Sequence, residues 1–453
     1  MIQTPTQETA QISGAGVYRP SPVDDEYRNK ARALRPFYFI VVVWGKRYTD
    51  FLCDYCIPSL LSPNNIPALL NSGNKFLIAT SIEDWARIQS RPIFDLLRRY
   101  VEPVFIRIPP YPEGTPNCAH MGTGHKLATH MAFEGQAYAA ILTPDLMVSD
   151  GTVAALQRHA VNGVELVWTA ALRFGEEPLF EHLRQMSVSS LDSHFGDEAR
   201  PLIVTGRQLV WAGIRSFHSE VLCCEWEKPY FPRFQIAAWW RVPREDGIIV
   251  HALSWAPLLI DYAALKHHDT SVMDDWTIDG DYIHRNFGLT AKVHVVQDSD
   301  EIMLASWGPM SDRAVPLEPV PEQSGQYSGE WEKGVWLYDT LNGPACDPLK
   351  RKIFMMPVYW HTRDFKQYRW DAIEIKAQNA IRKYGLRETL SGQMTAVAVK
   401  VMRNSRYARD VFHYYWGARR QTLNLAIQAV KGDSAARERV KNGLMIIVNR
   451  LTH

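Results

Sequence analysis

The sequence has no long apolar run and no excess of charge of either sign. None of its apolar stretches approaches the roughly 20 residues that a membrane-spanning helix needs, and residues 1–8 have neither the basic nor the apolar part of a signal peptide. Its 50 Lys and Arg residues balance 49 Asp and Glu residues, which excludes a global attraction to nucleic acid or to anionic membranes. We therefore expect a cytoplasmic protein with no transmembrane segment and no nucleic acid partner.

Cysteine is scarce, because only six residues are spread over 453 positions, and this excludes a disulfide framework. Cys53 and Cys56 form a Cys-x-x-Cys pair, but the surrounding pattern predicts that they lie three apart on one amphipathic helix. A redox pair needs the N-terminus of a helix, where the dipole lowers the thiol pKa, and a zinc site needs a second pair of ligands nearby. We expect both cysteines to belong to the core.

Apolar runs of strand length alternate with segments of helix length in the first third of the chain. The expected strands are residues 37–44, 75–80, 104–108 and 138–145, and the expected helices are residues 49–61, a helix that begins after Ser81, and residues 124–134. This alternation predicts an α/β fold with a mostly parallel sheet covered by helices on both faces. The turn after the first strand has neither the Gly-x-Gly-x-x-Gly fingerprint of dinucleotide folds nor the Gly-Lys-Ser/Thr of P-loops.

Composition divides the chain into four parts. Residues 1–35 are polar and contain proline, which predicts a flexible N-terminal extension. The α/β pattern fills residues 36–315, and residues 316–334 are rich in Pro, Glu, Ser and Gly, as linkers are. Residues 335–453 favour helix, which predicts a C-terminal helical subdomain.

The strand that begins at residue 138 delivers a carboxylate, because it ends in Thr143-Pro144-Asp145. In an α/β sheet, ligands bind outside the carboxyl ends of the strands, so Asp145 is placed where a metal ion and a phosphate can meet. Asp150 is followed by Gly151 and a helix-like segment, which indicates a turn or N-cap residue without a chemical role.

The order of these segments resembles bacterial glycosyltransferases of the GT-A type over about residues 36–305. The likeness rests on the strand with its Trp44-Gly45 turn, the helix that closes at residues 58–65, the strand-to-helix segment 76–84 and the strand that bears Asp145. The resemblance implies a Rossmann-like GT-A sheet, a nucleotide-diphosphate sugar as donor and a sugar-containing or other hydroxyl compound as acceptor. It also implies Mn²⁺ or Mg²⁺, held by an Asp-x-Asp motif against the diphosphate.

Carried over by position, the second Asp of this motif matches Asp145, whereas the first falls at Thr143 and departs from the family pattern. The family often adds a late His to the metal, which here matches His251 at the end of an apolar strand. A hydrogen-bonded His at a strand end explains His251 equally well.

The nucleotide is expected at the ends of the strands that close at Trp44, Thr80 and Asp145, with Gly45 in the first turn. Lys126 lies in a Gly-rich stretch that predicts the start of a helix, where the dipole and the ammonium group could together hold a phosphate. A solvated surface lysine is an equally supported interpretation of Lys126.

A second acidic cluster contains Asp279 and Asp281, and it is similar to the acceptor-side acids of some glycosyltransferases. Either carboxylate could orient acceptor hydroxyl groups or act as a general base. An Asp-Gly turn with solvated carboxylates is the alternative, but the nearby Trp276 and Tyr282 favour a sugar site. For residues 298–301, a solvated turn is the favoured interpretation.

Two functions from different classes follow from these patterns. The first is a metal-assisted glycosyltransferase, which the strand order and the position of Asp145 favour. The second is a non-catalytic sugar- or nucleotide-binding protein on a degenerate version of the same fold, which the missing first Asp favours. A hydrolase of nucleotide sugars would use the same site with water as the acceptor.

Overall fold

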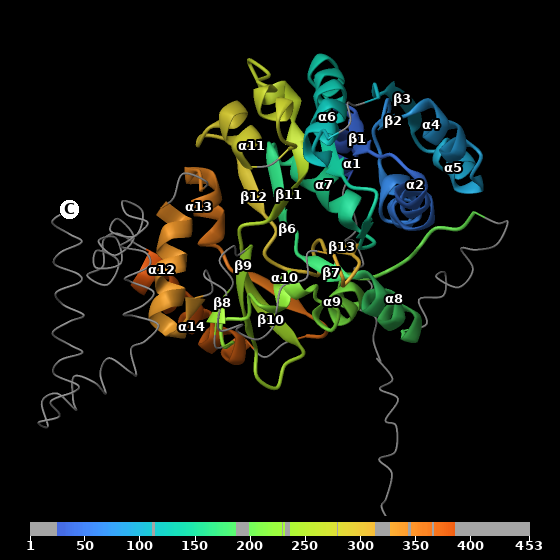
Figure 1. Ribbon diagram of the computed structural model, residues 1–453. Coiled ribbons are helices and arrows are strands. Elements are labelled where there is room, and N and C mark those ends of the chain that lie inside the picture. Colours follow the sequence, from blue (N-terminus) through green and yellow to red (C-terminus); the bar gives the residue numbers. More distant parts are fainter. Residues whose placement is uncertain are drawn as a thin grey trace, which may run out of the picture. The chain divides into compact units, whose positions relative to one another are not determined.

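The computed structural model describes residues 25–110, 114–186, 199–228, 230–231, 236–278, 280–312, 327–342, 346–364 and 367–385 (Figure 1). The chain divides into two compact units. The first comprises residues 1–228, 234–322 and 346–376, and the second comprises residues 229–233, 323–345 and 377–453. Within the described ranges, no helix is long and apolar enough to cross a membrane.

The first unit is built around a seven-stranded sheet with the order β12-β6-β11-β4-β1-β2-β3. Its strands are β1 (Phe37–Val42), β2 (Lys75–Thr80), β3 (Glu102–Arg107), β4 (Tyr138–Leu142), β6 (Leu166–Ala170), β11 (Trp255–Asp261) and β12 (Val293–Val295). The pairs β1/β2, β1/β4, β2/β3 and β12/β6 are parallel, and β11 runs antiparallel to both of its neighbours. The predicted α/β class with a mainly parallel sheet is confirmed.

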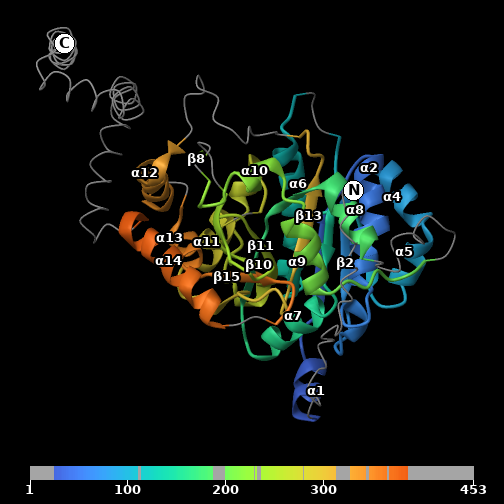
Figure 2. The same ribbon diagram turned by 90° about the horizontal axis from the view of Figure 1, so that it is seen from below.

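Helices follow most of these strands. The helices of the first unit are α1 (Asp25–Arg32), α2 (Lys46–Phe51), the π-helix η1 (Leu52–Cys56), α3 (Ile57–Leu60), η2 (Ile66–Ala68), α4 (Ile82–Gln89), α5 (Pro92–Leu97), α6 (Asn117–Glu134), α7 (Thr152–Val161), α8 (Glu176–Gln185), α9 (Gly206–Ile214), α10 (Ser219–Leu222), η3 (Tyr262–Ala264), η4 (Ser271–Asp274), α11 (Gly280–Phe287) and α13 (Pro348–Phe354). Figure 2 shows α2, α4 and α5 together beside β2.

Strand β1 explains why the sheet is covered on both faces. All of its residues are buried and apolar, and successive side chains of a strand point to opposite faces. Phe39 and Val41 pack into a core cluster with residues of η1, α3, α4, α5 and α7. Ile40 and Val42 pack into a second cluster that includes Ala128 and other residues of α6. The sheet therefore separates two apolar cores.

Two smaller sheets extend the first unit. One has the order β5-β13-β7, from β5 (Leu146–Val148), β13 (Leu304–Gly308) and β7 (Arg173–Gly175). The other has the order β15-β10-β9, from β15 (Val358–His361), β10 (Gly247–Ala252) and β9 (Ala237–Arg241). Residues 298–300 join β12 to this second sheet, since Ser299 donates its backbone N–H to the carbonyl of Tyr359 at 3.0 Å.

The C-terminal part departs from the helical subdomain that the sequence predicts from residue 335. The second unit contains β8 (Tyr230–Phe231), which pairs with β14 (Tyr327–Ser328), and α12 (Gly329–Asn342). The helix α14 (Gln367–Gly385) follows β15. Strand β15 pairs antiparallel with β10, so residues 346–376 complete the first unit. The helix-rich composition conceals this short strand, Val358-Tyr-Trp-His361, which is apolar enough to be buried.

Candidate functional site

The strand order of the seven-stranded sheet reverses between β1 and β4. From β1 the chain adds β2 and then β3 on one side, and it then places β4 on the other side of β1. These four strands are parallel, so their carboxyl ends meet at one edge. In open α/β sheets, ligands bind outside the carboxyl ends of the strands at such a reversal. Trp44 and Gly45 follow β1 and Asp145 follows β4, so three of the predicted site residues flank this point.

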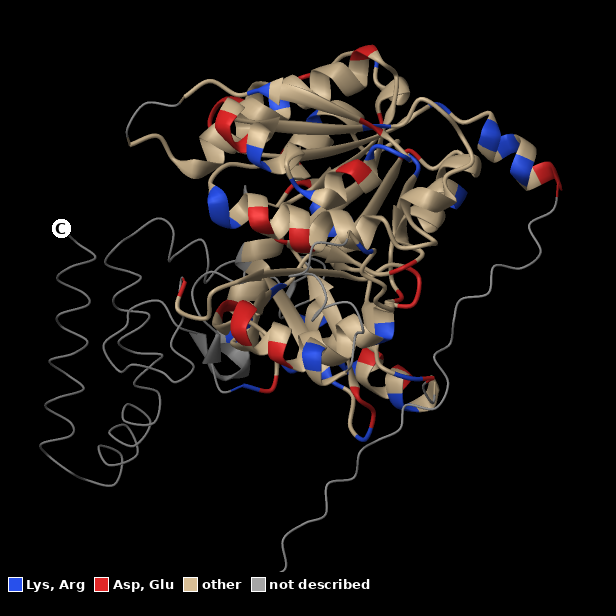
Figure 3. Ribbon diagram, turned by 90° about the vertical axis from the view of Figure 1, so that its right-hand side faces the viewer, with Lys and Arg blue, Asp and Glu red and all other residues tan. Residues whose placement is uncertain are grey.

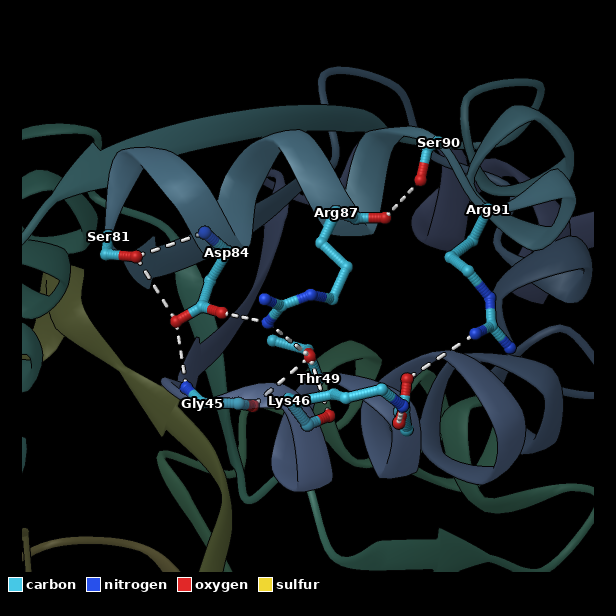
Figure 4. A network of polar contacts seen from close by, with 9 residues as sticks. Gly45, Lys46, Thr49, Ser81, Asp84, Arg87, Ser90 and Arg91 are labelled. Atoms are coloured by element: carbon cyan, nitrogen blue, oxygen red, sulfur yellow. Dashed lines mark hydrogen bonds and ion pairs between the residues drawn. The ribbon is translucent and has the colours of Figure 1, made fainter.

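The turn after β1 is held by a carboxylate from α4. Gly45 has a φ of 79°, in the left-handed region that favours glycine, and its N–H donates to Oδ2 of Asp84 at 2.8 Å (Figure 4). The backbone N–H of Asp84 donates to Oγ of Ser81, the N-cap of α4, at 3.0 Å. Because Ser81 directly follows β2, this network joins the ends of β1 and β2.

Two arginines near this turn already have acidic partners. Arg87 pairs with Asp84 (Figure 4), and Arg91 pairs with Asp54 of η1. Both guanidinium groups are thus neutralised in the free protein. A phosphate at this edge therefore needs another source of positive charge.

Asp145 is half-buried directly after β4, among groups of both signs. Burial raises the pKa of its carboxyl, whereas the nearby Thr143 side chain and the positive charge of Arg173 act in the opposite direction. Glu176 adds to the rise through like-charge repulsion. Ionisation of Asp145 is thus less favourable than that of an aspartate in water, and a bound cation would favour it.

The two charged groups that act on this carboxyl have ion-pair partners of their own. Arg47 Nη2 lies 2.5 Å from Oε2 of Glu176, and Arg173 Nη2 lies 2.8 Å from Oδ2 of Asp312. Arg173 Nη1 also lies 3.8 Å from Oε1 of Glu220. Asp145 and these ion-paired groups together comprise four acids and two arginines. Elsewhere on the molecule, acidic and basic residues are interspersed (Figure 3). The local acidic excess attracts cations and opposes direct binding of a diphosphate.

Helix α6 brings an imidazole to the reversal point. The rings of His120, in the first turn of α6, and Trp44 meet edge to face with their centroids 4.7 Å apart. His120 is buried, and burial lowers its pKa. A neutral imidazole and an indole therefore border the end of β1.

The prediction that Lys126 lies at a helix start is wrong. The helix α6 begins at Asn117, so Lys126 lies in its third turn, away from the N-terminal dipole. Its Nζ lies 2.7 Å from Oδ1 of Asp274. The glycines that suggested a helix start serve close packing instead, since a Cβ on Gly124 would lie 2.6 Å from Cγ1 of Val42. The phosphate role of Lys126 stays a prediction without the support of the dipole.

The predicted acceptor segment docks against α6. Nδ1 of His125 lies 2.7 Å from Oγ1 of Thr277, directly before α11. Asp281 lies in the first turn of α11, and its Oδ2 lies 2.9 Å from Nη2 of Arg285. Asp279 lies outside the described residues. An acid in a first helical turn is stabilised by the dipole, so the position of Asp281 is compatible with the structural alternative as well as with an acceptor role.

His251 does not lie with Asp145, because it belongs to β10 in the β15-β10-β9 sheet. It is fully buried, its Nδ1 lies 2.7 Å from the carbonyl oxygen of Phe354, and its ring packs edge to face on Trp240. Burial lowers the pKa of His251 to about 4. These contacts are those of a hydrogen-bonded histidine in the core. Among the described residues, no contact joins His251 to Asp145.

Thr80 ends β2 at the expected edge, but its side chain points into the protein. The residue is fully buried, and its Oγ1 has no hydrogen-bond partner among the described residues. Its carbonyl oxygen accepts from the N–H of Ile108 at 3.0 Å. Contact between Thr80 and a nucleotide thus stays a prediction.

Two clusters of His and carboxylate side chains escaped the sequence analysis, which favoured a solvated turn at residues 298–301. The segment is a turn as expected, with Asp300 exposed. The other two acids are not merely solvated, because Glu301 contacts His159 and His294, and Oδ1 of Asp298 lies 2.8 Å from Nε2 of His361. Burial raises the pKa of Glu301, but the hydrogen bonds with both histidines outweigh it and lower the pKa to about 2. His159 is 142 residues from Glu301 and His361 is 63 residues from Asp298, so local spacing gives no signal for these contacts.

The two expectations of structural roles agree with the structure. Cys53 and Cys56 are free and buried in η1, and burial raises the pKa of Cys53 to about 12. Oδ1 of Asp150 accepts from the N–H of Asn64 at 2.9 Å, and Oδ2 accepts from its Nδ2 at 2.7 Å. Gly151, with a φ of 98°, takes the N-cap position of α7. Asp150 is thus a turn residue that fixes a neighbouring loop.

Comparisons with known proteins add little to this geometry. No protein-family model matches the sequence, and no curated protein matches it. Among solved structures, a chain described as a glucose-1-phosphate thymidylyltransferase from Bacillus anthracis, in complex with sucrose, aligns with 32% of this chain at 9% identity and a TM-score of 0.20. The aligned part covers 57% of that chain. A TM-score this low carries no argument, so the α/β class rests on the strand pairing described above.

Proposed function

We propose that the chain is a glycosyltransferase that binds a nucleotide-diphosphate sugar at the reversal between β1 and β4. The observation that carries this proposal is the placement of Gly45 and Asp145 on the two sides of the point where the strand order reverses. Gly45 is exposed and leaves room for close approach of a ligand to the backbone. The ring pair of Trp44 and His120 offers an aromatic surface beside the same turn.

The residues at this edge fit a hard divalent ion such as Mn²⁺ or Mg²⁺. Such ions are held in phosphate-binding sites by one or two carboxylates together with the phosphates of the substrate, so Asp145 alone can supply the protein ligand. The excess of acids over arginines around Asp145 favours a cation there. The ion would offset the negative charge that develops on the diphosphate when the sugar bond breaks. His251 does not fit as a second ligand, because it lies in another sheet.

The chain's own residues perform the remaining tasks in this proposal. Asp84 holds the Gly45 turn in place by a hydrogen bond, and in this proposal the donor binds against that turn. The segment before α11 lies on α6, whose first turn contacts Trp44, so one helix links the donor edge to the predicted acceptor segment. Trp276 in that segment is 52% exposed, as an aromatic platform for a sugar ring would be. Asp281 and Asp279 keep their predicted acceptor role within this proposal.

A non-catalytic nucleotide- or sugar-binding protein is the second candidate. It is favoured by Thr143, which stands where the family motif has its first Asp. One ionisable ligand in place of two weakens metal binding, and binding without turnover would follow.

Calorimetry and turnover assays on the full chain distinguish these proposals. Common nucleoside diphosphates are titrated with Mn²⁺ and with Mg²⁺, and the matching nucleotide sugars are tested for release of the diphosphate with and without hydroxyl acceptors. We expect metal-dependent binding that Asp145→Asn weakens at least about tenfold. Asp95→Asn is the control, because this exposed acid pairs only loosely with Arg98, at 3.9 Å.

Each outcome decides one point. Binding and turnover that both need Asp145 support the transferase, and turnover with water as the only acceptor indicates the hydrolase. Binding without turnover supports the non-catalytic protein. Absence of binding for every diphosphate with either metal contradicts the proposed donor site.

A further inference from the structure

Side chains from a helix, a strand and the loop after that strand converge beside the edge strand β12. His159 lies in the last turn of α7, His294 in β12, and Glu301 in the loop between β12 and β13. Nε2 of His159 lies 2.6 Å from Oε1 of Glu301, and Nε2 of His294 lies 3.0 Å from the same oxygen and 3.1 Å from Oε2. The two imidazole rings stack with their centroids 3.9 Å apart. All three side chains thus direct potential ligand atoms to one place.

We propose that His159, His294 and Glu301 form a binding site for a divalent transition metal ion of the Zn²⁺ class. Two imidazole nitrogens and one carboxylate oxygen are a donor set found in three-ligand zinc sites. Imidazole selects Zn²⁺, Co²⁺, Ni²⁺ or Cu²⁺, whereas Mg²⁺ and Ca²⁺ prefer sites made only of oxygen ligands. This ion is therefore of a different class from the one proposed at Asp145.

The distances between the ligand atoms allow this coordination. With metal–ligand bonds of about 2.0–2.2 Å, the atoms of a tetrahedral set lie roughly 3.3 Å apart. The nitrogens now lie 2.6 and 3.0 Å from Oε1 of Glu301, and all the ligand atoms lie within 4.8 Å of one another. Small movements of the side chains are thus enough. Coordination requires an unprotonated Nε2, so a hydrogen now shared with Glu301 moves to Nδ1 or to solvent.

Burial and position also suit a bound ion. The side chains of His159, Glu301 and His294 are 15%, 25% and 33% exposed, so the site is reachable from solvent yet held by its surroundings. Each ligand belongs to a different element, and β12 forms one end of the sheet. The ion would link α7, the edge strand and the following loop. Two strands, β6 and β11, separate β12 from β4, so the site is distinct from the proposed donor edge.

The test measures metal binding by the full chain after chelator treatment and desalting. We expect one high-affinity Zn²⁺ by calorimetry, and a visible absorption spectrum typical of tetrahedral coordination when Co²⁺ replaces it. His159→Ala and His294→Ala should each weaken Zn²⁺ binding on the order of 100-fold or more, since even changes to groups that only support a ligand cost about 10–100-fold. His130→Ala is the matched control, because His130 forms an exposed pair with Glu134, at 3.2 Å.

A conservative variant separates coordination from folding. His294→Gln retains a donor for the hydrogen bond to Glu301, so the fold and the metal-free melting temperature should be kept while the Co²⁺ spectrum is lost. The proposal is overturned if Zn²⁺ does not bind. It is also overturned if binding and the Co²⁺ spectrum persist in His159→Ala and His294→Gln, because the ion then occupies another site.

Discussion

Gly122 of α6 packs directly against the backbone of residues 273–276, so closely that no side chain fits between them. The variant Gly122→Ala therefore tests how α6 holds this segment. A Cβ on Gly122 would lie 2.1 Å from the carbonyl oxygen of Trp276 and 2.3 Å from that of Met273. Non-bonded carbon atoms prefer separations of about 3.5–4.0 Å. Since both obstacles are backbone atoms, rotation of a side chain cannot relieve the clash, and the segment must retreat by more than about 1 Å.

The contacts that this displacement would break give the expected change in the free energy of unfolding. The displacement would break the hydrogen bond between His125 and Thr277, worth about 1 kcal/mol, and would loosen the packing of Met273, which is 1% exposed and contributes roughly 2 kcal/mol. The exposed pair of Lys126 and Asp274 adds little. Alanine regains about 1 kcal/mol of helix propensity over glycine. We expect a net loss of about 2 kcal/mol in the free energy of unfolding.

Urea unfolding measures this loss, and hydrogen exchange of residues 271–277 shows where it arises. Thr123→Ala is the control, because it introduces the same residue into the same helix at a half-buried position. We expect the control to change stability by less than about 0.5 kcal/mol and to leave exchange unchanged. If Gly122→Ala is as stable as the control, with unchanged exchange in 271–277, the close packing described here does not exist.

Two further predictions concern buried polar groups. Burial lowers the pKa of both His125 and His251 to about 4, below the unfolded value of about 6.5, so only the unfolded chain takes up these protons between the two values. The resulting stability is full above pH 6.5 and is lost as the pH falls to 4, by about 1.4 kcal/mol per pH unit and per histidine. Urea unfolding at pH 7.0 and 5.5 checks this. In His125→Gln, the free energy of unfolding should depend less steeply on pH, by the contribution of one proton. An unchanged slope would show that His125 is accessible. Thr80→Val removes a buried hydroxyl that has no described partner, so we expect a gain of up to about 1 kcal/mol in urea unfolding, whereas a clear loss would reveal a hydrogen bond at that oxygen.

The sequence predicted correctly those elements whose local residue pattern favours the same structure as their position in the fold. Residues 37–42 and 75–80 are continuous apolar runs, and both are buried strands as expected. The helix after Ser81 begins there because the Ser81 side chain accepts from the N–H of Asp84. In such segments, the residue types, the cap and the burial all favour the same structure.

The errors arose where a residue serves a contact that lies far away in the chain. Gly122 and Gly124 resemble a helix start in sequence, but they permit close approach of α6 to a segment 150 residues later and to β1. His251 resembles a metal ligand, but its partner is the carbonyl of Phe354 in α13. His159, one partner of Glu301, is just as remote. No local pattern carries such information.

The late position of β15 has a consequence for how the chain folds during synthesis. Strand β12 ends at Val295, so the seven-stranded sheet can form once that residue has left the ribosome. The outer edge of β10 stays open until β15, which ends at His361, has also emerged. At about 5–20 residues per second, the ribosome takes several seconds to add that stretch. During this interval, the nascent chain presents one open edge of an apolar strand, and that is when a chaperone that binds open strand edges would be needed.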